Sequence, residues 1–190
     1  MQKGKIGFAM CGSFCTFKKV LPQIKNLVDR GYEVFPIMSE AAYSTDTRFG
    51  KAEDFVKEIE KMTNKKIIHT VFSAEPIGPK KMLDALVIAP CTGNTIGKLA
   101  NGVFDSSVTL AAKAHLRNER PLIIAVSTND ALSGSAKNIG TLMGRKDVYF
   151  VPMKQDDPIG KPRSVVADFD YIEKTIEDAL NGVQTQPIYL

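Results

Sequence analysis

The sequence is poor in the residues that most often bind metals. Its 190 residues include three cysteines, two histidines and no tryptophan. Cys11 and Cys15 are close together, but no second cysteine pair follows, and His69 and His115 are distant from them in the chain. Because structural zinc sites use four closely spaced ligands, we expect no metal site. A low, odd number of cysteines also indicates free thiols in a reducing compartment.

Long hydrophobic runs and strong charge are absent as well. No stretch reaches the roughly 18 apolar residues of a membrane span, and the apolar run near the N-terminus is too short for a signal peptide. We therefore expect a cytoplasmic protein that does not contact membranes. The net charge of +4 is a mild excess, compatible with a small anionic ligand or an acidic partner. Without a dense basic run, nucleic-acid binding is not expected.

Short apolar runs alternate with helical patterns along the chain. Residues 85–89 and 122–126 are apolar throughout, as strands buried in a parallel sheet require. This alternation predicts an α/β fold with three layers, a Rossmann-like parallel sheet with helices on both faces. We expect a single domain over residues 1–183 and a C-terminal tail at 184–190. The other predicted strands are 5–10, 33–38, 67–71 and 148–151, the last in the chain; the predicted helices are 17–30, 52–62, 95–101, 107–117 and 168–181.

Three residues give further detail on the predicted helices and strands. Gly31 is placed to end the first helix. Pro36 lies within a predicted strand and requires a position where its missing N–H is not needed. A further helix is expected to begin near Leu132.

The loop after the first predicted strand has the features of an anion site. Gly12 allows close approach of the backbone, Ser13 offers a hydroxyl, and Phe14 leads into a helix whose N-terminal N–H groups attract negative charge. The loop lacks the dinucleotide pattern G-x-G-x-x-G, so NAD is not indicated on this chain. The alternative interpretation is an ordinary helix N-cap.

Polar residues follow three other predicted strands. Ser39 follows the second strand, and either contacts the same anion or caps a turn. Thr92, Asn94 and Thr95 follow the strand at 85–89, and so many polar groups behind a buried strand favour ligand contact. Ser127 follows the strand at 122–126, and either faces the ligand or caps the next helix. In open α/β sheets these strand ends meet at one edge, where ligands bind.

No catalytic set can be assembled from the spacing alone. Asn94 is the one catalytic candidate among the polar residues that follow the predicted strands. Asp130 is a possible acid or base, and Asp105 is interpreted as a cap for the helix at 107–117. The three cysteines flank the proposed loops, where a thiol is either reactive near a helix N-terminus or a small buried apolar residue.

The segment 89–105, APCTGNTIGKLANGVFD, resembles the flavoprotein family that includes flavin-dependent cysteine decarboxylases and flavin prenyltransferases. Together with the Gly12-Ser13 loop, the resemblance covers nearly the whole chain. It implies that Gly12, Ser13 and Ser39 hold the phosphate of flavin mononucleotide (FMN), or a phosphate in its place. It also implies that Thr92, Asn94 and Thr95 lie along the phosphate and ribityl side and that Ser127 approaches the ring. Family members form trimers or dodecamers with the flavin at the boundary between chains, so a homo-oligomer is expected.

Two places depart from the family pattern. The catalytic His-Ile pair of the decarboxylases is replaced by Glu75-Pro76-Ile77, and their Pro-x-Met-Asn substrate clamp by Ser127-Thr128-Asn129-Asp130. The Arg-Glu pair of the prenyltransferases is absent too. A narrower resemblance is to a flavoprotein-like component that assists an oxidoreductase. It implies a dehydrogenase-like partner that carries NAD(P), with this chain either taking part in the oxidation or serving as a non-catalytic scaffold.

Overall fold

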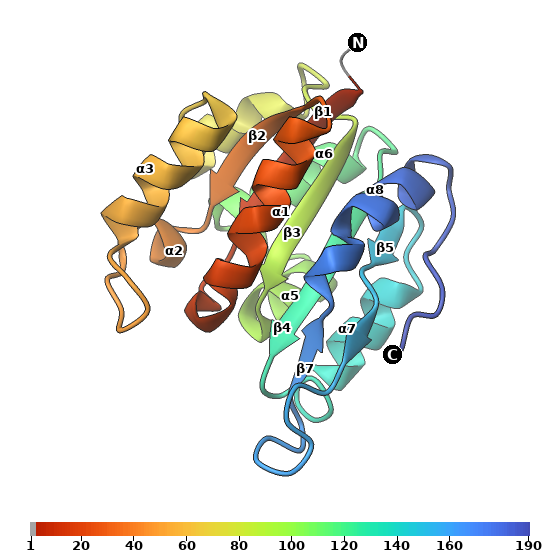
Figure 1. Cartoon of the computed structure of the whole chain (residues 1–190). Helices are drawn as coiled ribbons and strands as arrows, with labels where there is room; N and C mark the ends of the chain where they lie inside the picture. Colours follow the sequence, from red (N-terminus) through yellow and green to blue (C-terminus); the bar gives the residue numbers. More distant parts are fainter. Residues whose placement is uncertain (1–2) are drawn as a thin grey trace.

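The computed structural model describes residues 3–190, which form a seven-stranded sheet (Figure 1). The parallel strands are β1 (Gly4–Met10), β2 (Tyr32–Met38), β3 (Ala85–Cys91), β4 (Leu122–Thr128) and β5 (Val148–Phe150). They pair in the order β2-β1-β3-β4, and β5 pairs with β4. Because β1 and β3 are neighbours, the sheet winds outward in both directions from that pair. The carboxyl ends of β1 and β3 are therefore where a ligand site is expected.

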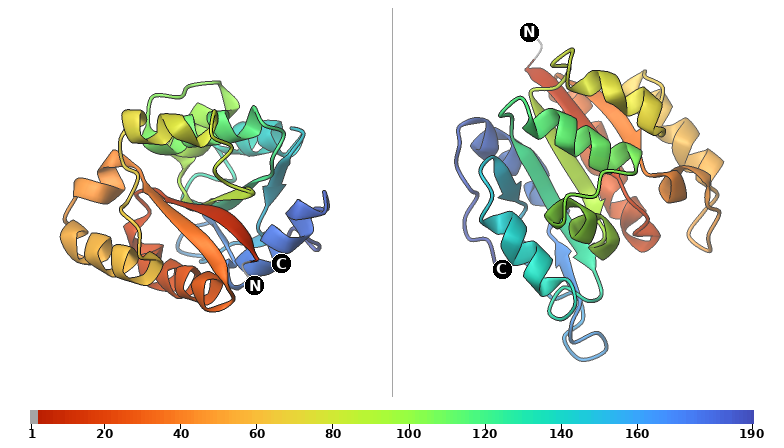
Figure 2. Two further views of the ribbon diagram at one scale, coloured as in Figure 1. Left: turned by 90° about the horizontal axis from the view of Figure 1, so that it is seen from above. Right: turned by 180° about the vertical axis from the view of Figure 1, so that it is seen from behind.

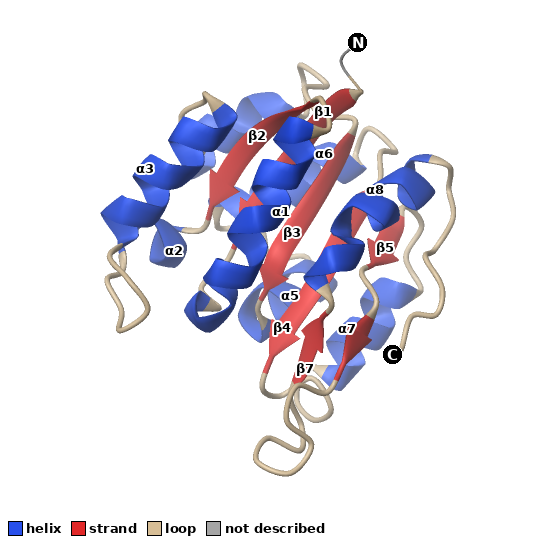
Figure 3. Cartoon of the chain, in the orientation of Figure 1, coloured by secondary structure: helices blue, strands red, loops and turns tan. Residues whose placement is uncertain are grey.

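Helices cover both faces of this sheet (Figures 2 and 3). One face carries α1 (Phe17–Asp29), α3 (Ala52–Thr63) and α8 (Ile172–Leu180), and the other carries α5 (Gly93–Ala100), α6 (Ser107–Leu116) and α7 (Ala136–Met143). Two short helices, α2 (Glu40–Ser44) and α4 (Val71–Ala74), and the 3-10 turns η1 (Phe14–Thr16), η2 (Glu75–Ile77) and η3 (Phe169–Tyr171) complete the helical elements of the described chain.

The hydrophobic core is divided in two by the sheet. Along β3, Val87 and Ala89 pack in the cluster under α1 and α8, whereas Leu86 and Ile88 pack in the cluster under α5 and α6. This alternation is the two-residue period of a strand buried on both faces. The predicted three-layer α/β fold is confirmed.

β2 lies at the edge of the sheet, where the sequence predicts a further strand at 67–71. The Pro36 carbonyl accepts a hydrogen bond from the Ile68 N–H at 2.9 Å, so the missing N–H of Pro36 faces the edge, where no neighbouring strand needs it. The predicted strand at 67–71 is wrong, because a single bridge from Ile37 to Ile68 is all that forms. Thr70 then caps α4 in a reciprocal capping box with Ser73, which turns the chain away from the sheet.

The predicted helices form, but some of their ends differ from the prediction. The last helix, predicted at 168–181, begins with the 3-10 turn η3, and α8 starts only at Ile172. Gly31 ends α1 with φ of 91°, a left-handed conformation that favours glycine. The helix predicted near Leu132 begins only at Ala136, because the Asp130 carbonyl accepts from the N–H groups of Ser133 and Ser135 and holds a turn there. The cap of α6 is Ser106 and not Asp105, whose carboxylate pairs with a lysine instead.

The C-terminal part adds antiparallel strands to the parallel sheet. β6 (Met153–Lys154) and β7 (Val165–Ala167) follow β5, which corrects the prediction that 148–151 is the last strand. β5 pairs with the first half of β4, and β7 pairs with its end at Ser127 and Thr128. The segment 184–190, predicted as a tail, runs beside β5 and β6, where Met153 forms a bridge with Tyr189. None of the helices within residues 3–190 is long and apolar enough to cross a membrane.

Candidate functional site

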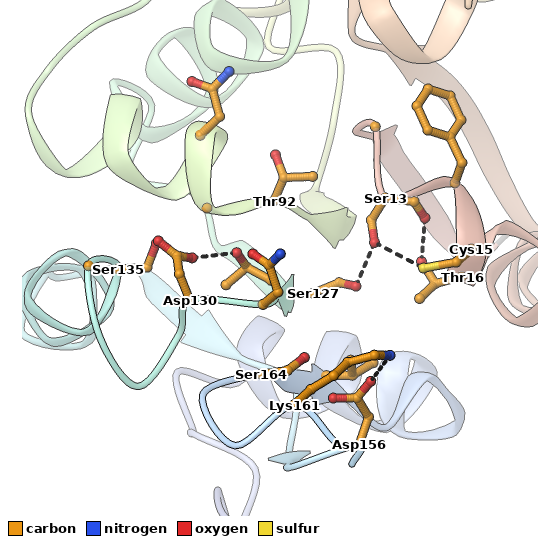
Figure 4. Close-up of a pocket in the computed structure, with 18 of the residues that line it drawn as sticks. Ser13, Cys15, Thr16, Thr92, Ser127, Asp130, Ser135, Asp156, Lys161 and Ser164 are labelled. Atoms are coloured by element: carbon orange, nitrogen blue, oxygen red, sulfur yellow. Dashed lines mark hydrogen bonds and ion pairs between the residues drawn. The ribbon is translucent and has the colours of Figure 1, made fainter. Parts of the chain in front are cut away.

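A cavity of about 1200 Å³ opens at the carboxyl ends of β1, β3 and β4 (Figure 4). Its walls are the loop after β1, the start of α5, the loop from β4 to α7, and the segment between β6 and β7. Six of the residues proposed from the sequence line it: Gly12, Ser13, Phe14, Thr92, Asn94 and Ser127. Segments far apart in the sequence are thus brought to one place by the ends of the parallel strands, as open α/β sheets require.

The loop after β1 is joined to the end of β4 by a pair of hydroxyls. Ser13 Oγ and Ser127 Oγ lie 2.8 Å apart (Figure 4). The Ser13 carbonyl accepts from both the N–H and the hydroxyl of Thr16, which fixes the turn into η1. The Ser13 side chain makes no cap hydrogen bond to that turn. Ser13 is thus the N-cap residue of η1 by position but does not cap it through its side chain, and its hydroxyl lies on the cavity wall.

The three polar residues proposed at the start of α5 have different positions relative to the cavity. Thr92 is the N-cap and accepts from the Thr95 N–H, yet it also lines the cavity. Asn94 is exposed at the cavity. Thr95 is buried, and its hydroxyl donates to Cys11 Sγ at 3.2 Å. Thr95 lies behind the wall of the cavity and does not line it.

Ser39 is also absent from the cavity wall. Its side chain accepts from the Ala42 N–H and caps α2, and its own N–H donates to the Met10 carbonyl at the end of β1. Of the two roles considered for Ser39 from the sequence, the structure shows the capping contact.

The loop after β4 carries an ionised carboxylate. Asp130 Oδ1 accepts from the Thr128 hydroxyl at 2.6 Å and from the Ser135 hydroxyl at 2.9 Å. The hydrogen bond from Thr128, aided by that from Ser135, holds the pKa of Asp130 below its usual range against the effect of partial burial. Asp130 is thus present as an anion at neutral pH, on the cavity wall.

The segment between β6 and β7 contributes residues that the sequence analysis did not propose. Lys161, Asp156 and Ser164 line the cavity, and Lys161 Nζ pairs with Asp156 at 3.2 Å (Figure 4). They enter because β7 pairs antiparallel with the end of β4. The short strands β6 and β7 have two and three residues, too few for a hydrophobic period to be recognised in the sequence. Lys19 on α1 also lines the cavity.

Two of the cysteines are buried apolar side chains. Burial raises the pKa of Cys11 to about 11, although the hydrogen bond from Thr95 opposes this. Burial, followed by the neighbouring Cys11, raises the pKa of Cys91 well above its usual value. Burial therefore disfavours a reactive thiolate at both positions. Cys15 is exposed and lines the cavity mouth.

The two family departures occupy different parts of the molecule. Glu75–Ile77 forms η2, which packs against α6 and does not line the cavity. Residues 127–130, in contrast, form part of the cavity wall. Of the two departures, only the second therefore lines the cavity, where Asp130 supplies a carboxylate.

Comparison with known proteins gives a consistent result. A family model described as "Flavoprotein" matches residues 1–177. The B subunit of dipicolinate synthase from Bacillus subtilis is 50% identical over 187 residues, which cover 98% of this chain and 94% of the relative. The flavin prenyltransferase UbiX of Thermoplasma acidophilum is 27% identical over 136 residues, 72% of this chain and 73% of the relative.

Solved structures show the same fold. The crystal structure of the dipicolinate synthase B subunit from Bacillus halodurans superposes with a TM-score of 0.91 and 43% identity, covering 100% of this chain and 97% of that one. The FMN-dependent cysteine decarboxylase SpaF has a TM-score of 0.70 at 21% identity, covering 93% of this chain and 97% of that one, and so supports the fold alone. The resemblance inferred from the sequence is confirmed.

Proposed function

The chain belongs to the flavoprotein family, and from that premise we propose that its cavity binds flavin mononucleotide with the phosphate at the loop of Gly12 and Ser13. The observation that carries this proposal is the hydroxyl pair of Ser13 and Ser127, 2.8 Å apart on the cavity wall. A cavity of about 1200 Å³ accommodates a ligand of this size. The donors on the cavity wall are hydroxyls, three asparagine amides and two lysines, which suit a phosphate and a polyhydroxyl chain.

The proposed residues have distinct roles. Gly12, Ser13 and Phe14 surround the phosphate, and Lys19, which also lines the cavity, adds positive charge. Thr92 and Asn94 contact the ribityl chain. Ser127, whose hydroxyl lies 2.8 Å from that of Ser13, is assigned to the phosphate side and not to the ring that the family resemblance implies. Ser39 and Thr95 support the site indirectly, by holding α2 and the end of β1. When bound, the flavin supplies a hydride acceptor that side chains lack.

Flavin binding is tested by titrating the purified protein with FMN and with riboflavin, which lacks the phosphate. We expect Ser13→Ala to weaken FMN binding roughly 10-fold, the effect of one hydrogen bond to a charged group. Ser44→Ala is the matched control, because its hydroxyl bonds Glu40 on α2 and does not line the cavity. Equal affinity for FMN and riboflavin would contradict a phosphate site at Ser13.

We further propose that the chain acts as the B subunit of a dipicolinate synthase, assisting the oxidation of dihydrodipicolinate to dipicolinate in the mother-cell cytoplasm during sporulation. The support is 50% identity to a protein of that name over 98% of the chain. The oxidation removes a hydride and a proton from the ring. We assign NAD(P) to a dehydrogenase-like A subunit, because the loop after β1 here lacks the dinucleotide pattern.

Co-expression with the A subunit distinguishes this role from two alternatives. Loss of synthase activity on Ser13→Ala or Asn94→Ala, with the complex intact, supports participation of the cavity in the reaction. Full activity of both variants, combined with loss when the chain is omitted, would instead identify a non-catalytic scaffold. Decarboxylation or prenyl transfer without the A subunit would identify an FMN-dependent enzyme of the other family type.

We also propose that the chain forms a homo-oligomer, a trimer or dodecamer, with the cavity at the boundary between chains. The support is family membership and the position of the cavity, which opens at the surface of the single chain beside the half-exposed ring of Phe49. The mass of the protein in solution, with and without FMN, tests this assembly.

A further inference from the structure

The two ends of the cavity differ in charge. Ser13 lies on one side of the close-up and Asp130, bonded to Thr128 and Ser135, on the other (Figure 4), while Lys19 and the ion pair of Lys161 with Asp156 also line the cavity. Ser127 lies between Ser13 and Asp130 in the close-up (Figure 4). A ligand with an anionic group at one end and a hydrogen-bond donor at the other matches this arrangement, whereas the reverse orientation places the anion against a carboxylate.

The Asp130 carboxylate keeps unused acceptor capacity. Oδ1 accepts from the hydroxyls of Thr128 and Ser135, at 2.6 and 2.9 Å, and Oδ2 accepts from Ser135 alone, at 3.0 Å. A carboxylate can accept about four hydrogen bonds, so Oδ2 has room for a donor from the cavity. Because the group is ionised, it accepts and does not donate. Its preferred partner is therefore an N–H or an O–H.

Gly93 brings the start of α5 against this carboxylate. A Cβ on Gly93 would lie 2.8 Å from Asp130 Oδ1, 2.7 Å from Thr128 Oγ1 and 2.8 Å from Ser135 Oγ. The positive end of the α5 dipole thus already faces a negative charge. A phosphate placed at α5 would meet Asp130, and a phosphate placed at Ser13 would not. The charge pattern directs the phosphate to the Ser13 end and the other end of the ligand to Asp130.

We propose that Asp130 fixes the orientation of the flavin by accepting a hydrogen bond from the imide N–H of its ring. This inference rests on the proposed FMN site. The imide is the one ring N–H of an oxidised flavin, and the ring is the part of FMN farthest from the phosphate. Asp130 then determines which edge of the ring is recognised. The Pro-x-Met-Asn pattern of the decarboxylases contains no carboxylate that could take this role.

The test compares FMN with an FMN methylated at the imide nitrogen, which cannot donate. Wild-type protein is expected to bind FMN roughly 10-fold more tightly than the methylated flavin, the effect of a hydrogen bond to a charged acceptor. In Asp130→Ala this preference is expected to disappear. A purely structural role for Asp130 would instead lower the affinity for both flavins equally and leave the ratio unchanged.

Asp156→Ala is the matched control, because Asp156 is a second carboxylate on the cavity wall that pairs with Lys161. We expect this variant to keep the wild-type preference. The wild-type comparison needs no variant, so it can overturn the proposal even if Asp130→Ala does not fold. Equal binding of the two flavins by wild-type protein would overturn the role of Asp130 and leave the FMN site standing. Failure of wild-type protein to bind FMN at all would overturn both.

Discussion

Gly93 and Gly97 lie one turn apart on α5 and have different surroundings. A Cβ on Gly93 would be under 3 Å from three oxygens of the Asp130 cluster, whereas a Cβ on Gly97 would meet only Asn138 Nδ2 at 3.5 Å, an ordinary contact. We expect Gly93→Ala to destabilise the fold by about 1–3 kcal/mol through overpacking. Gly97→Ala should stabilise it by about 0.5–1 kcal/mol through helix propensity. Urea unfolding of the two variants measures both, and a stabilising Gly93→Ala would contradict the close packing of α5 on Asp130.

His115 is a buried neutral histidine, and this makes the stability of the fold depend on pH. Its side chain is 1% exposed, with Nε2 3.0 Å from the Pro121 carbonyl oxygen. Burial lowers its pKa to about 4 from 6.5. Below pH 6.5, His115 becomes protonated in the unfolded chain but stays neutral in the folded chain. The stability due to neutral His115 is thus fully present above pH 6.5 and is lost as the pH falls toward 4.

The expected loss from His115 alone is about 2 kcal/mol between pH 7.5 and pH 5. His115→Gln keeps an N–H donor near Pro121 but cannot take up a proton. Its free energy of unfolding should therefore fall by about 2 kcal/mol less than that of wild type between pH 7.5 and pH 5. His69→Gln, which removes the other histidine, is the matched control. The free energy of unfolding in urea at the two pH values is the measurement, and identical losses in wild type and His115→Gln would exclude a neutral buried histidine.

At the scale of single residues, the sequence predicted loops that line the cavity but not the position of every side chain. Ser13 and Ser127 could be proposed because the end of a parallel strand is a position readable from the sequence. Thr95 lies in the same segment as Thr92, but its position on α5 turns it toward Cys11 and away from the cavity. Lys161 could not be proposed, because it reaches the cavity through the antiparallel pairing of β7 with β4.

At the scale of elements, the strand β5 is completed by a side chain. The Gln184 amide accepts from the Phe150 N–H at 2.8 Å and donates to the Phe150 carbonyl at 2.7 Å. These two hydrogen bonds take the place of those that a neighbouring strand would make with Phe150, which is 1% exposed. Gln184→Ala leaves both backbone groups without this partner, and we expect a loss of about 2 kcal/mol. Gln186→Ala is the control, because Gln186 is exposed. Equal stability of the two variants in urea would refute this role.

Element prediction succeeded where a strand is buried on both faces and failed where local capping hydrogen bonds form instead of sheet pairing. The strands at 85–89 and 122–126 are apolar at every position and are buried on both faces, so their pattern is unambiguous. Residues 67–71 also carry apolar residues, but Thr70 and Ser73 satisfy each other in a capping box and begin α4. Such side chain to backbone bonds compete directly with the hydrogen bonds of a sheet.

At the scale of the whole molecule, the proposed oligomer and the proposed flavin site are linked. The cavity of one chain is open, and its mouth includes the exposed side chains of Cys15 and Phe49. If a neighbouring chain covers the flavin, binding and assembly stabilise each other, because a ligand that contacts both chains favours the assembled state. Flavin affinity should then depend on protein concentration, which a site complete within one chain would not show.

We expect a trimer of about 62 kDa, three chains of 20.8 kDa, or a dodecamer of about 250 kDa, twelve such chains. Light scattering after size-exclusion chromatography measures the mass with and without FMN. Titration at two protein concentrations, one well below the concentration at which the oligomer dissociates, should give weaker FMN binding to the dilute protein. A monomer of 20.8 kDa that binds FMN with the same affinity at both concentrations would show that the cavity is complete without a neighbour. In that case the open mouth would be left for the substrate or the dehydrogenase-like partner.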